Sequence, residues 1–373
     1  MNLKISKNFS YIALGQMIAT GFQAVFYLIF ASLLEPEFYG EMSYLIAIAG
    51  IFSVFSRFGL NHTVTVYQAK EKHSIANQIN VLVLITSGFA SLILLWINEF
   101  AAVLCLGFTF FAMNQHNLLG LKKYKKFAKV AILKSLLIIT IPILLYLVME
   151  IPGIILGMAI SNLIASSGYL KSLSRKIGSF RDIKKIFKVI INNFGIDAST
   201  ALPTIVDKLV IVPFFGFLSV GIYQFNLQIL FALGILPVIL HAFLLPEISS
   251  GKTHNKITYW VLIGSIILTI ISILLAPLIV NEFFPKFREG IFGLQIMVIS
   301  LIPLTISSIF TARLQAAEST KVGYSGVFRI GSLLVLLIVL GGLYGMEGLS
   351  FAVLTSTIVY SISLALLYYK SKF

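Results

Sequence analysis

The chain is dominated by long apolar stretches in which charged residues are almost absent, and this feature constrains its fold most. A helix needs about 20 apolar residues to cross a bilayer. Twelve stretches of at least that length occur, at residues 9–34, 40–59, 78–97, 100–119, 128–149, 151–170, 189–217, 219–245, 258–280, 290–312, 322–344 and 348–369. Of the 373 residues only 11% are charged, against about a quarter in soluble domains. The sequence therefore predicts an all-α integral membrane protein with 12 transmembrane helices, and not a β-barrel of short alternating strands.

The distribution of Lys and Arg predicts the orientation of these helices. With the N-terminus inside, 23 of the 28 basic residues fall in inner segments, and only Lys286 and Arg288 fall in outer loops. Cytoplasmic loops of membrane proteins carry such an excess. The pattern predicts a multi-pass protein of the cytoplasmic membrane with both termini in the cytoplasm. The net charge of +14 is explained by this orientation, so no nucleic-acid partner is expected.

The longest polar segment, residues 171–188, divides the predicted helices into two sets of six. We expect an N-terminal six-helix bundle at 1–180 and a C-terminal six-helix bundle at 181–373. The turns at 34–40 and 216–223 both place a Tyr/Gly pair near the end of the first helix of a set, which indicates a weak internal repeat. Because six is even, the repeats would be parallel, related by an axis along the membrane normal.

Motifs of known catalytic and cofactor sites are absent. Cys105 is the one cysteine, so neither a disulfide framework nor a cysteine metal site is expected. The chain has no Gly-rich phosphate loop ending in Lys-Ser/Thr, no H-E-x-x-H and no G-x-S-x-G, which are signatures of nucleotide, zinc and hydrolase sites. We therefore predict that the protein is not an enzyme and has no cofactor or metal. Energy for transport would come from an ion gradient or from consumption of the substrate on the far side.

Charged residues inside the apolar stretches are the strongest candidates for a functional site, because each costs at least ~2.5–3.5 kcal/mol at a helix centre. Predicted helix 189–217 carries Asp197, Asp207 and Lys208. Asp197 and Lys208 are eleven residues apart, about 20° around an ideal helix, with Thr204 on the same stripe. This polar stripe is expected to face the interior of the bundle. The alternative is a structural Asp–Lys pair that bonds a neighbouring helix.

Three further basic residues are candidates for the functional site, but each also has a simpler structural explanation. Lys134 and Arg329 lie about two turns from the predicted cytoplasmic helix ends, where they either line a cavity or extend to the headgroups. Arg57 lies at a helix end, where positive charge is common. Amides at helical spacing either bond sugar hydroxyls or join helices; they are Gln16, Gln23, Gln224 and Gln228.

Several short motifs, in order along nearly the whole chain, resemble those of one family. Residues 34–40, Leu-Glu-Pro-Glu-Phe-Tyr-Gly, resemble its L-G-P-x-x-Y-G turn, and Phe58-Gly59-Leu60 resembles its x-G-L at the end of helix two. Similar matches are the basic link at 119–128, Asp207-Lys208-Leu209 followed by Gly221-Ile222-Tyr223, and Pro246-Glu247-Ile248-Ser249. The sequence thus resembles the polysaccharide and O-antigen flippases of the MOP (multidrug/oligosaccharidyl-lipid/polysaccharide) exporter superfamily.

The resemblance implies a MATE-like fold and a transporter that flips a polyprenyl-phosphate-linked oligosaccharide to the outer leaflet by alternating access. Lys208 would attract the substrate phosphate, and Asp197 or Asp207 would balance its charge in the empty site. Expected partners are the lipid-linked glycan, membrane lipids, H⁺ or Na⁺ as coupling ion, and glycan-assembly enzymes. Two alternatives stay open. One is a multidrug or organic-cation antiporter, and the other is a membrane glycan polymerase or glycosyltransferase, which usually needs a larger outer loop than residues 281–290.

Overall fold

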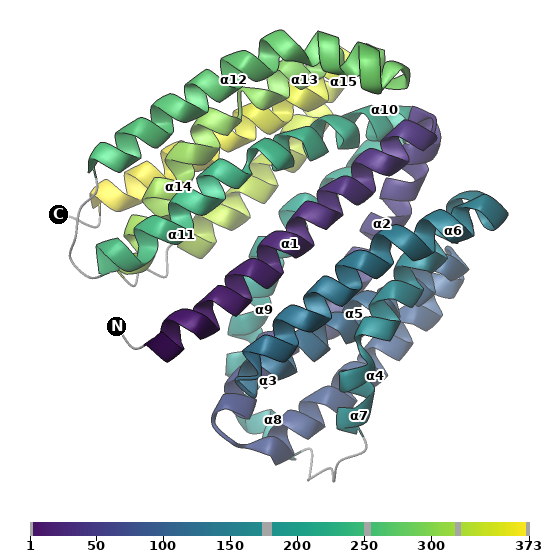
Figure 1. Cartoon of the computed structure of the whole chain (residues 1–373), viewed down its shortest axis with the longest axis vertical. Helices are drawn as coiled ribbons and strands as arrows, with labels where there is room; N and C mark the ends of the chain where they lie inside the picture. Colours follow the sequence, from purple (N-terminus) through teal and green to yellow (C-terminus); the bar gives the residue numbers. More distant parts are fainter. Residues whose placement is uncertain (1–2, 174–180, 250–254, 318–321, 371–373) are drawn as a thin grey trace. The chain divides into compact units, whose positions relative to one another are not determined.

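The computed structural model describes residues 3–173, 181–249, 255–317 and 322–370, and these form helices and turns with no strand among them. By its internal contacts the chain divides into two compact units. Unit 1 comprises residues 1–26 and 44–205, and unit 2 comprises residues 27–43 and 206–373. The chain order of their helices is seen in Figure 1. The domains expected at 1–180 and 181–373, as two six-helix bundles, stay a prediction.

Helices α1 (Leu3–Leu33) and α2 (Pro36–Arg57) contribute residues to both units. The other elements of unit 1 are α3 (Leu60–Ala69), α4 (His73–Leu95), α5 (Glu99–Gly120), α6 (Tyr124–Ala165), α7 (Ser167–Leu173), α8 (Arg181–Lys185), α9 (Phe187–Ala201) and the 3-10 helix η1 (Leu202–Thr204). Their apolar faces meet in a core that includes Val64, Ile79, Phe110 and Tyr169. The short helices α3, α7 and α8 lie between or at the ends of apolar stretches and were not predicted from the sequence.

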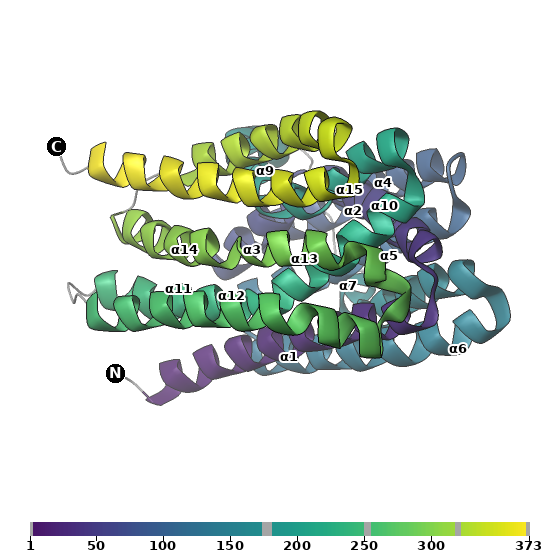
Figure 2. The ribbon, with the colours of Figure 1, turned by 90° about the horizontal axis from the view of Figure 1, so that it is seen from above.

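The breaks that separate the predicted stretches 78–97 from 100–119 and 128–149 from 151–170 are very short turns in unit 1. Glu150 has φ 53° and ψ −133°, which ends one arm of α6 and begins another. The arms run back along each other, because the backbone at Gly153 lies against that of Leu145, and Figure 2 shows this reversal. At the second turn Asn98 is extended, and its side chain accepts a hydrogen bond from the backbone N–H of Ala101 at the start of α5. A side-chain oxygen at this position replaces a missing helical acceptor.

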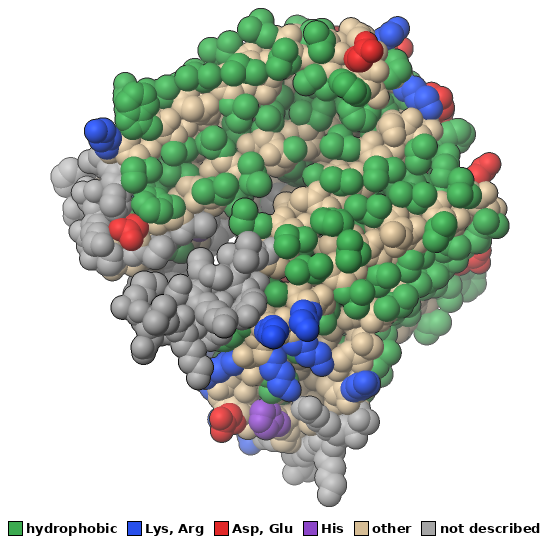
Figure 3. All heavy atoms as spheres, viewed as in Figure 1, with side chains coloured by type: hydrophobic (Ala, Val, Ile, Leu, Met, Phe, Trp, Pro, Cys, Tyr) green, Lys and Arg blue, Asp and Glu red, His purple; other side chains and the backbone are tan. Residues whose placement is uncertain are grey.

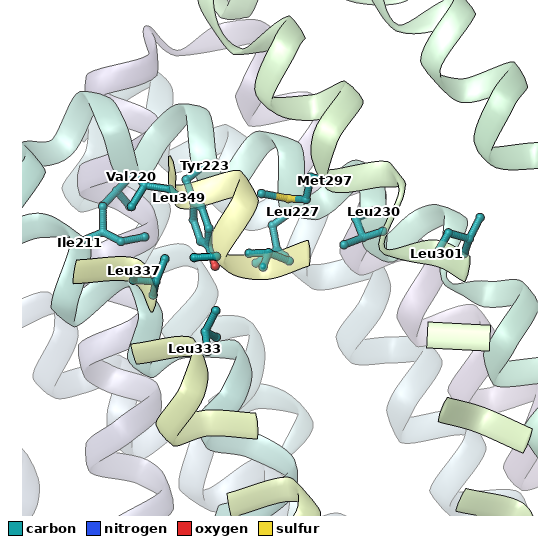
Figure 4. Close-up of a cluster of buried hydrophobic side chains, with 12 residues drawn as sticks. Ile211, Val220, Tyr223, Leu227, Leu230, Met297, Leu301, Leu333, Leu337 and Leu349 are labelled. Atoms are coloured by element: carbon teal, nitrogen blue, oxygen red, sulfur yellow. The ribbon is translucent and has the colours of Figure 1, made fainter. Parts of the chain in front are cut away.

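Unit 2 consists of seven elements besides residues 27–43: α10 (Val206–Leu233), α11 (Ile235–Ser249), α12 (Asn255–Phe283), the 3-10 helix η2 (Pro285–Gly290), α13 (Ile291–Val298), α14 (Leu301–Ala316) and α15 (Val322–Lys370). Gly345, with φ 59°, divides α15 into two arms. The core of the unit joins α10, α13, α14 and α15. Figure 4 shows Tyr223, Leu227 and Leu337 among its side chains.

The turn between α1 and α2 packs directly on α10 within unit 2. A Cβ added at Gly40 would lie 1.9 Å from the carbonyl oxygen of Phe217, and one at Gly221 would lie 1.7 Å from the carbonyl oxygen of Pro36. Only glycine permits backbones to approach this closely. The two glycine-containing turns that the sequence suggested as a repeat are therefore in contact with each other.

The lengths and surfaces of the helices show a multi-pass membrane protein. In the described part of the chain, seven helices are long and apolar enough to span a bilayer: Pro36–Arg57, His73–Leu95, Tyr124–Ala165, Val206–Leu233, Lys256–Phe283, Pro285–Ala316 and Ser325–Lys370. Large apolar side chains are exposed along them, such as Val148 (80%) and Leu274 (72%), and hydrophobic side chains are spread over much of the face seen in Figure 3. In water such a surface would aggregate, whereas lipid solvates it. The total of twelve spans stays a prediction.

The predicted helix 189–217 is not one continuous helix. It is divided into α9, η1 and the first part of α10, and Gly216 (φ 77°) ends that part. Pro203 lies in η1, and proline both removes a backbone donor and disfavours the helical conformation of the residue before it. The angular relation inferred between Asp197 and Lys208 assumed an ideal helix, so it was wrong.

Candidate functional site

A group of polar side chains from α2, α3, α5 and α9 meets inside unit 1. We call it the Asp197 cluster; it comprises Ser53, Arg57, Asn61, His62, His116 and Asp197. Both Arg57 and Asp197 are buried, and Nη2 of Arg57 lies 3.5 Å from Oδ2 of Asp197. Nδ2 of Asn61 donates to Oδ1 of Asp197 at 3.2 Å, and Nε2 of His62 lies 3.7 Å from that oxygen. The carboxylate thus faces a guanidinium, an amide and an imidazole.

Glycine at position 59 brings this cluster together. Gly59 has φ 74° and separates the last turn of α2, which carries Arg57, from the first turn of α3, which carries Asn61. A Cβ at Gly59 would lie 2.2 Å from the backbone nitrogen of Phe194 on α9. Glycine therefore permits both the left-handed turn and the close approach of α9, which carries Asp197. The x-G-L motif of the sequence is thus explained by local geometry.

The rest of the cluster orients Arg57. Nη1 of Arg57 donates to Oγ of Ser53 at 2.6 Å, and Thr109 donates to the same oxygen at 2.9 Å. The rings of His62 and His116 meet edge to face at 4.8 Å. Nε of Arg57 is buried and has no hydrogen-bond partner among the described residues. The cluster therefore combines a fixed buried cation, an N–H of that cation without a partner among the described residues, and two imidazole rings.

A second, tighter arrangement lies in unit 2, and we call it the Asp207 pair. Nζ of Lys208 donates to both carboxylate oxygens of Asp207, at 2.9 and 3.1 Å. The hydroxyl of Tyr223 donates to Oδ2 of Asp207 at 2.8 Å. Asp207 is 1% exposed and Lys208 4%. Each of the two buried groups therefore has a hydrogen-bonding neighbour, and a buried ion pair is tolerated only with such partners.

The polar stripe predicted on one helix is therefore split between two sites. Asp197 contacts Arg57 in unit 1, and Lys208 contacts Asp207 in unit 2. Thr204, expected between them on the same face, lies in η1 and is exposed. The proposal that a carboxylate balances Lys208 is compatible with the contact to Asp207, but Asp197 makes its contacts elsewhere.

Lys134 and Arg329 are half-buried cations without an acidic partner in the described part of the chain. Nζ of Lys134 donates to Oε1 of Gln23 at 3.2 Å and lies 5.7 Å from the ring centre of Phe111. The guanidinium of Arg329 lies 5.2 Å from the ring centre of Tyr360, and its Nε has no hydrogen-bond partner among the residues that the structure describes. Aromatic faces attract cations more weakly than carboxylates do, so both groups keep most of their capacity to bind an anion.

The predicted amides differ in their surroundings. Gln23 accepts from Lys134, while the side chain of Gln16 lies outside the described part. Gln224 and Gln228 are buried, and Oε1 of Gln224 has no hydrogen-bond partner among the described residues. The packing of α10 therefore accounts for the burial of these two amides, but it does not provide a hydrogen-bond partner for every polar atom of their side chains.

Sequence reasoning missed the role of α3 and the C-terminal part of α5. Polar residues end α5 next to a run of lysines, yet Asn114 and Asn117 among them are buried. Asn117 exchanges hydrogen bonds with Asn80 and accepts from Gln68. His116, on the same turn, joins the Asp197 cluster through Asn61. The sequence contains one signal for these contacts, which is the high density of amide side chains near a short apolar segment. The same pattern also fits an exposed end of a helix, so it did not identify the buried contacts.

A family model described as "Polysaccharide biosynthesis protein" matches residues 5–252, about two thirds of the chain. The chain belongs to this polysaccharide biosynthesis protein family. The match includes both the Asp197 cluster and the Asp207 pair. The resemblance expected from the sequence is therefore confirmed.

Comparison with other proteins places this family member among known transporter folds. It is 26% identical to an uncharacterized membrane protein of Methanocaldococcus jannaschii, over 95% of this chain and 96% of that protein. Its structure is similar to a lipid II flippase in an inward closed conformation, with a TM-score of 0.76, 16% identity, and coverage of 95% and 87% of the two chains. It is also similar to an inward-facing multidrug resistance MATE family transporter of the MOP superfamily, with a TM-score of 0.74, 14% identity and 98% coverage of each chain. The polysaccharide biosynthesis protein thus has the fold of MOP superfamily transporters.

Proposed function

We propose that this protein is a transporter that flips a polyprenyl-phosphate-linked oligosaccharide from the cytoplasmic to the outer leaflet of the cytoplasmic membrane. It would act by alternating access, without catalysis, with both termini in the cytoplasm. Family membership and the fold shared with a lipid II flippase support this proposal. Membrane lipids, a coupling H⁺ or Na⁺ and glycan-assembly enzymes are its proposed partners.

The observation that carries the proposal is the balance of buried charge. In the described part of the chain, the buried carboxylates are Asp197 and Asp207, and each lies within 3.5 Å of a cation. Lys134 and Arg329, by contrast, face rings or an amide and no carboxylate. The surplus charge inside the helices is therefore positive. A positive surplus suits a substrate with a phosphate, because lysine and arginine are common phosphate ligands.

The same balance disfavours a multidrug or organic-cation antiporter. A cationic drug needs a carboxylate that is free to face it, and here both buried carboxylates already contact Lys208 or Arg57. Binding such a drug would require breaking one of these pairs and leaving a cation buried without its partner.

Within this transporter we propose that cations of each unit attract the substrate phosphate, namely Lys134 and Arg57 in unit 1 and Arg329 in unit 2. Arg57 would offer its Nε–H, which has no hydrogen-bond partner among the described residues. Lys208 would reach the phosphate only at the cost of its contacts with Asp207. The candidate amides would bond sugar hydroxyls; these are Gln16, Gln23, Gln224 and Gln228. Thr204, which is exposed in η1, would add a hydroxyl to this set of candidates.

Leaflet assignment of the lipid-linked glycan tests the function. In cells that lack the protein, we expect the glycan to be made and to accumulate in the cytoplasmic leaflet, protected from a membrane-impermeant oxidant applied outside. Expression of the intact protein should expose it to the oxidant. Cells that cannot make the lipid-linked glycan at all would favour the glycosyltransferase alternative and contradict the flippase.

Substitution of the two cations tests the site. Lys134→Gln and Arg329→Gln should each reduce export at least tenfold at normal membrane abundance, while Lys134→Arg and Arg329→Lys should retain part of it. Lys129→Gln is the matched control, because Lys129 is exposed on the same helix as Lys134. Unchanged export by the Lys134→Gln/Arg329→Gln double variant would rule out their contact with the phosphate.

A further inference from the structure

A small cavity opens in unit 2 beside η2 and the turn that divides α15. Its volume of about 10 Å³ is that of a single water molecule or ion. Glu289 and Glu347, both exposed, are among the residues that line this cavity, and Asn226 and Ser350, both 2% exposed, line it from the protein interior. The cavity is thus bordered by two acidic residues and by two residues with neutral side-chain oxygen atoms.

The side chain of Asn226 has one acceptor without a donor. Its Nδ2 donates to the carbonyl oxygen of Gly290 at 3.0 Å, which fixes the orientation of the amide. Oδ1 is buried and has no hydrogen-bond partner among the described residues. A buried acceptor without a hydrogen-bond donor is unfavourable unless a cation faces it. This oxygen is the observation that distinguishes the cavity from a mere pair of surface glutamates.

The glycines of the segment that follows η2 keep the space beside Asn226 open. A Cβ added at Gly293 would lie 2.8 Å from Oγ of Ser350 and 3.2 Å from Nδ2 of Asn226. One added at Gly290 would lie 3.4 Å from Oδ1 of Asn226. Any larger residue would therefore fill the floor of the cavity.

We propose that this cavity binds one divalent cation of the calcium type through Glu289, Glu347, Oδ1 of Asn226 and Oγ of Ser350. The ligand atoms of this site are all oxygens, which hard cations prefer. The two carboxylates together balance a charge of +2. With only two carboxylates, we expect a Kd on the order of 10⁻⁴–10⁻³ M, as in extracellular calcium modules. In the orientation predicted from the basic residues, this end of unit 2 faces outward.

The ion would join three segments of unit 2. Its ligands come from α10 (Asn226), η2 (Glu289) and α15 (Glu347 and Ser350). Tyr223 also lines the cavity, and its hydroxyl donates to Asp207. Binding would therefore stabilise the part of the unit that surrounds the Asp207 pair. This inference is independent of the transported substrate.

Thermal unfolding of the purified full-length protein, with and without Ca²⁺ at constant ionic strength, tests the site. At about ten times the Kd, we expect Ca²⁺ to raise the Tm of the native protein by roughly 2 °C. The Glu289→Gln/Glu347→Gln variant should fold, since both side chains are exposed, and should lose this shift. Glu282→Gln is the matched control, because Glu282 is exposed near the same turn but does not line the cavity.

A second measurement reports binding directly. Tb³⁺ bound beside Tyr223 should give tyrosine-sensitised luminescence that Ca²⁺ competes away, and Asn226→Leu should weaken it. Three results would overturn the proposal: no shift in Tm for the native protein, an undiminished shift in the Glu289→Gln/Glu347→Gln variant, or an equal shift with Na⁺ at matched ionic strength.

Discussion

The Asp197 cluster and the Asp207 pair hold a buried carboxylate and a buried cation in two different ways. In the Asp207 pair the charges belong to adjacent residues and are joined by two contacts of 2.9 and 3.1 Å. In the Asp197 cluster the carboxylate and the guanidinium come from different helices, 3.5 Å apart, and each has further partners of its own. The Asp207 pair is stabilised mainly by the short contacts between two adjacent residues, whereas the stabilisation of the cluster is distributed over several helices.

This difference indicates different roles. A pair with a single strong contact is destabilised by any change that leaves its partner buried and unpaired. A network with several weak contacts can exchange one of them without losing the rest. We therefore expect the Asp207 pair to be needed mainly for the integrity of unit 2, and the Asp197 cluster to tolerate rearrangement during transport.

The largest effect is expected from Asp207→Asn. It removes the carboxylate that Lys208 contacts at 2.9 and 3.1 Å, so the free energy of unfolding should fall by about 3–5 kcal/mol, with a matching loss of membrane abundance. The Asp207→Asn/Lys208→Gln double variant should recover most of the loss, because no charge then remains unpaired. Abundance and unfolding in detergent measure both. A double variant as unstable as the single one would show that the pair is not the origin of the effect.

A smaller effect is expected from Tyr223→Phe, which removes one hydrogen bond to the Asp207 carboxylate. Hydrogen bonds to charged groups contribute roughly 1.5–3 kcal/mol. Tyr169→Phe is the matched control, since its buried hydroxyl donates to a neutral carbonyl, that of Asn80, at 2.6 Å; such bonds average ~0.6 kcal/mol between membrane helices. Equal losses of unfolding free energy for the two variants would mean that charge does not strengthen the Tyr223 contact.

Part of this arrangement could be predicted from the sequence. Apolar length and the scarcity of charge predicted the helices, and the rarity of carboxylates within them singled out Asp197 and Asp207. The partners could not be predicted in the same way. Pro203 interrupts the helix on which the 20° relation depended, so local periodicity did not extend across it. The approach of α9 to Gly59 is a tertiary contact, and no spacing along the chain encodes it.

The smallest effect is expected from Asp197→Asn. This variant tests most directly whether the Asp197 cluster depends less on a single contact than the Asp207 pair does. The asparagine keeps an oxygen that accepts from Asn61 or Arg57, and Arg57 keeps its 2.6 Å bond to Ser53. We expect a loss of about 1–2 kcal/mol in unfolding free energy, between the values for exposed and buried pairs.

A double-mutant cycle with Arg57→Gln isolates the direct contact from these other partners. Its coupling energy should be below that of the Asp207–Lys208 cycle, because a 3.5 Å contact shared with an amide and an imidazole carries only part of the stabilisation. A coupling energy equal to or larger than that of the Asp207 pair would contradict the distributed network. Asp197 and Arg57 would then form a second structural pair, and rearrangement of the cluster during transport would carry the same cost as breaking the first.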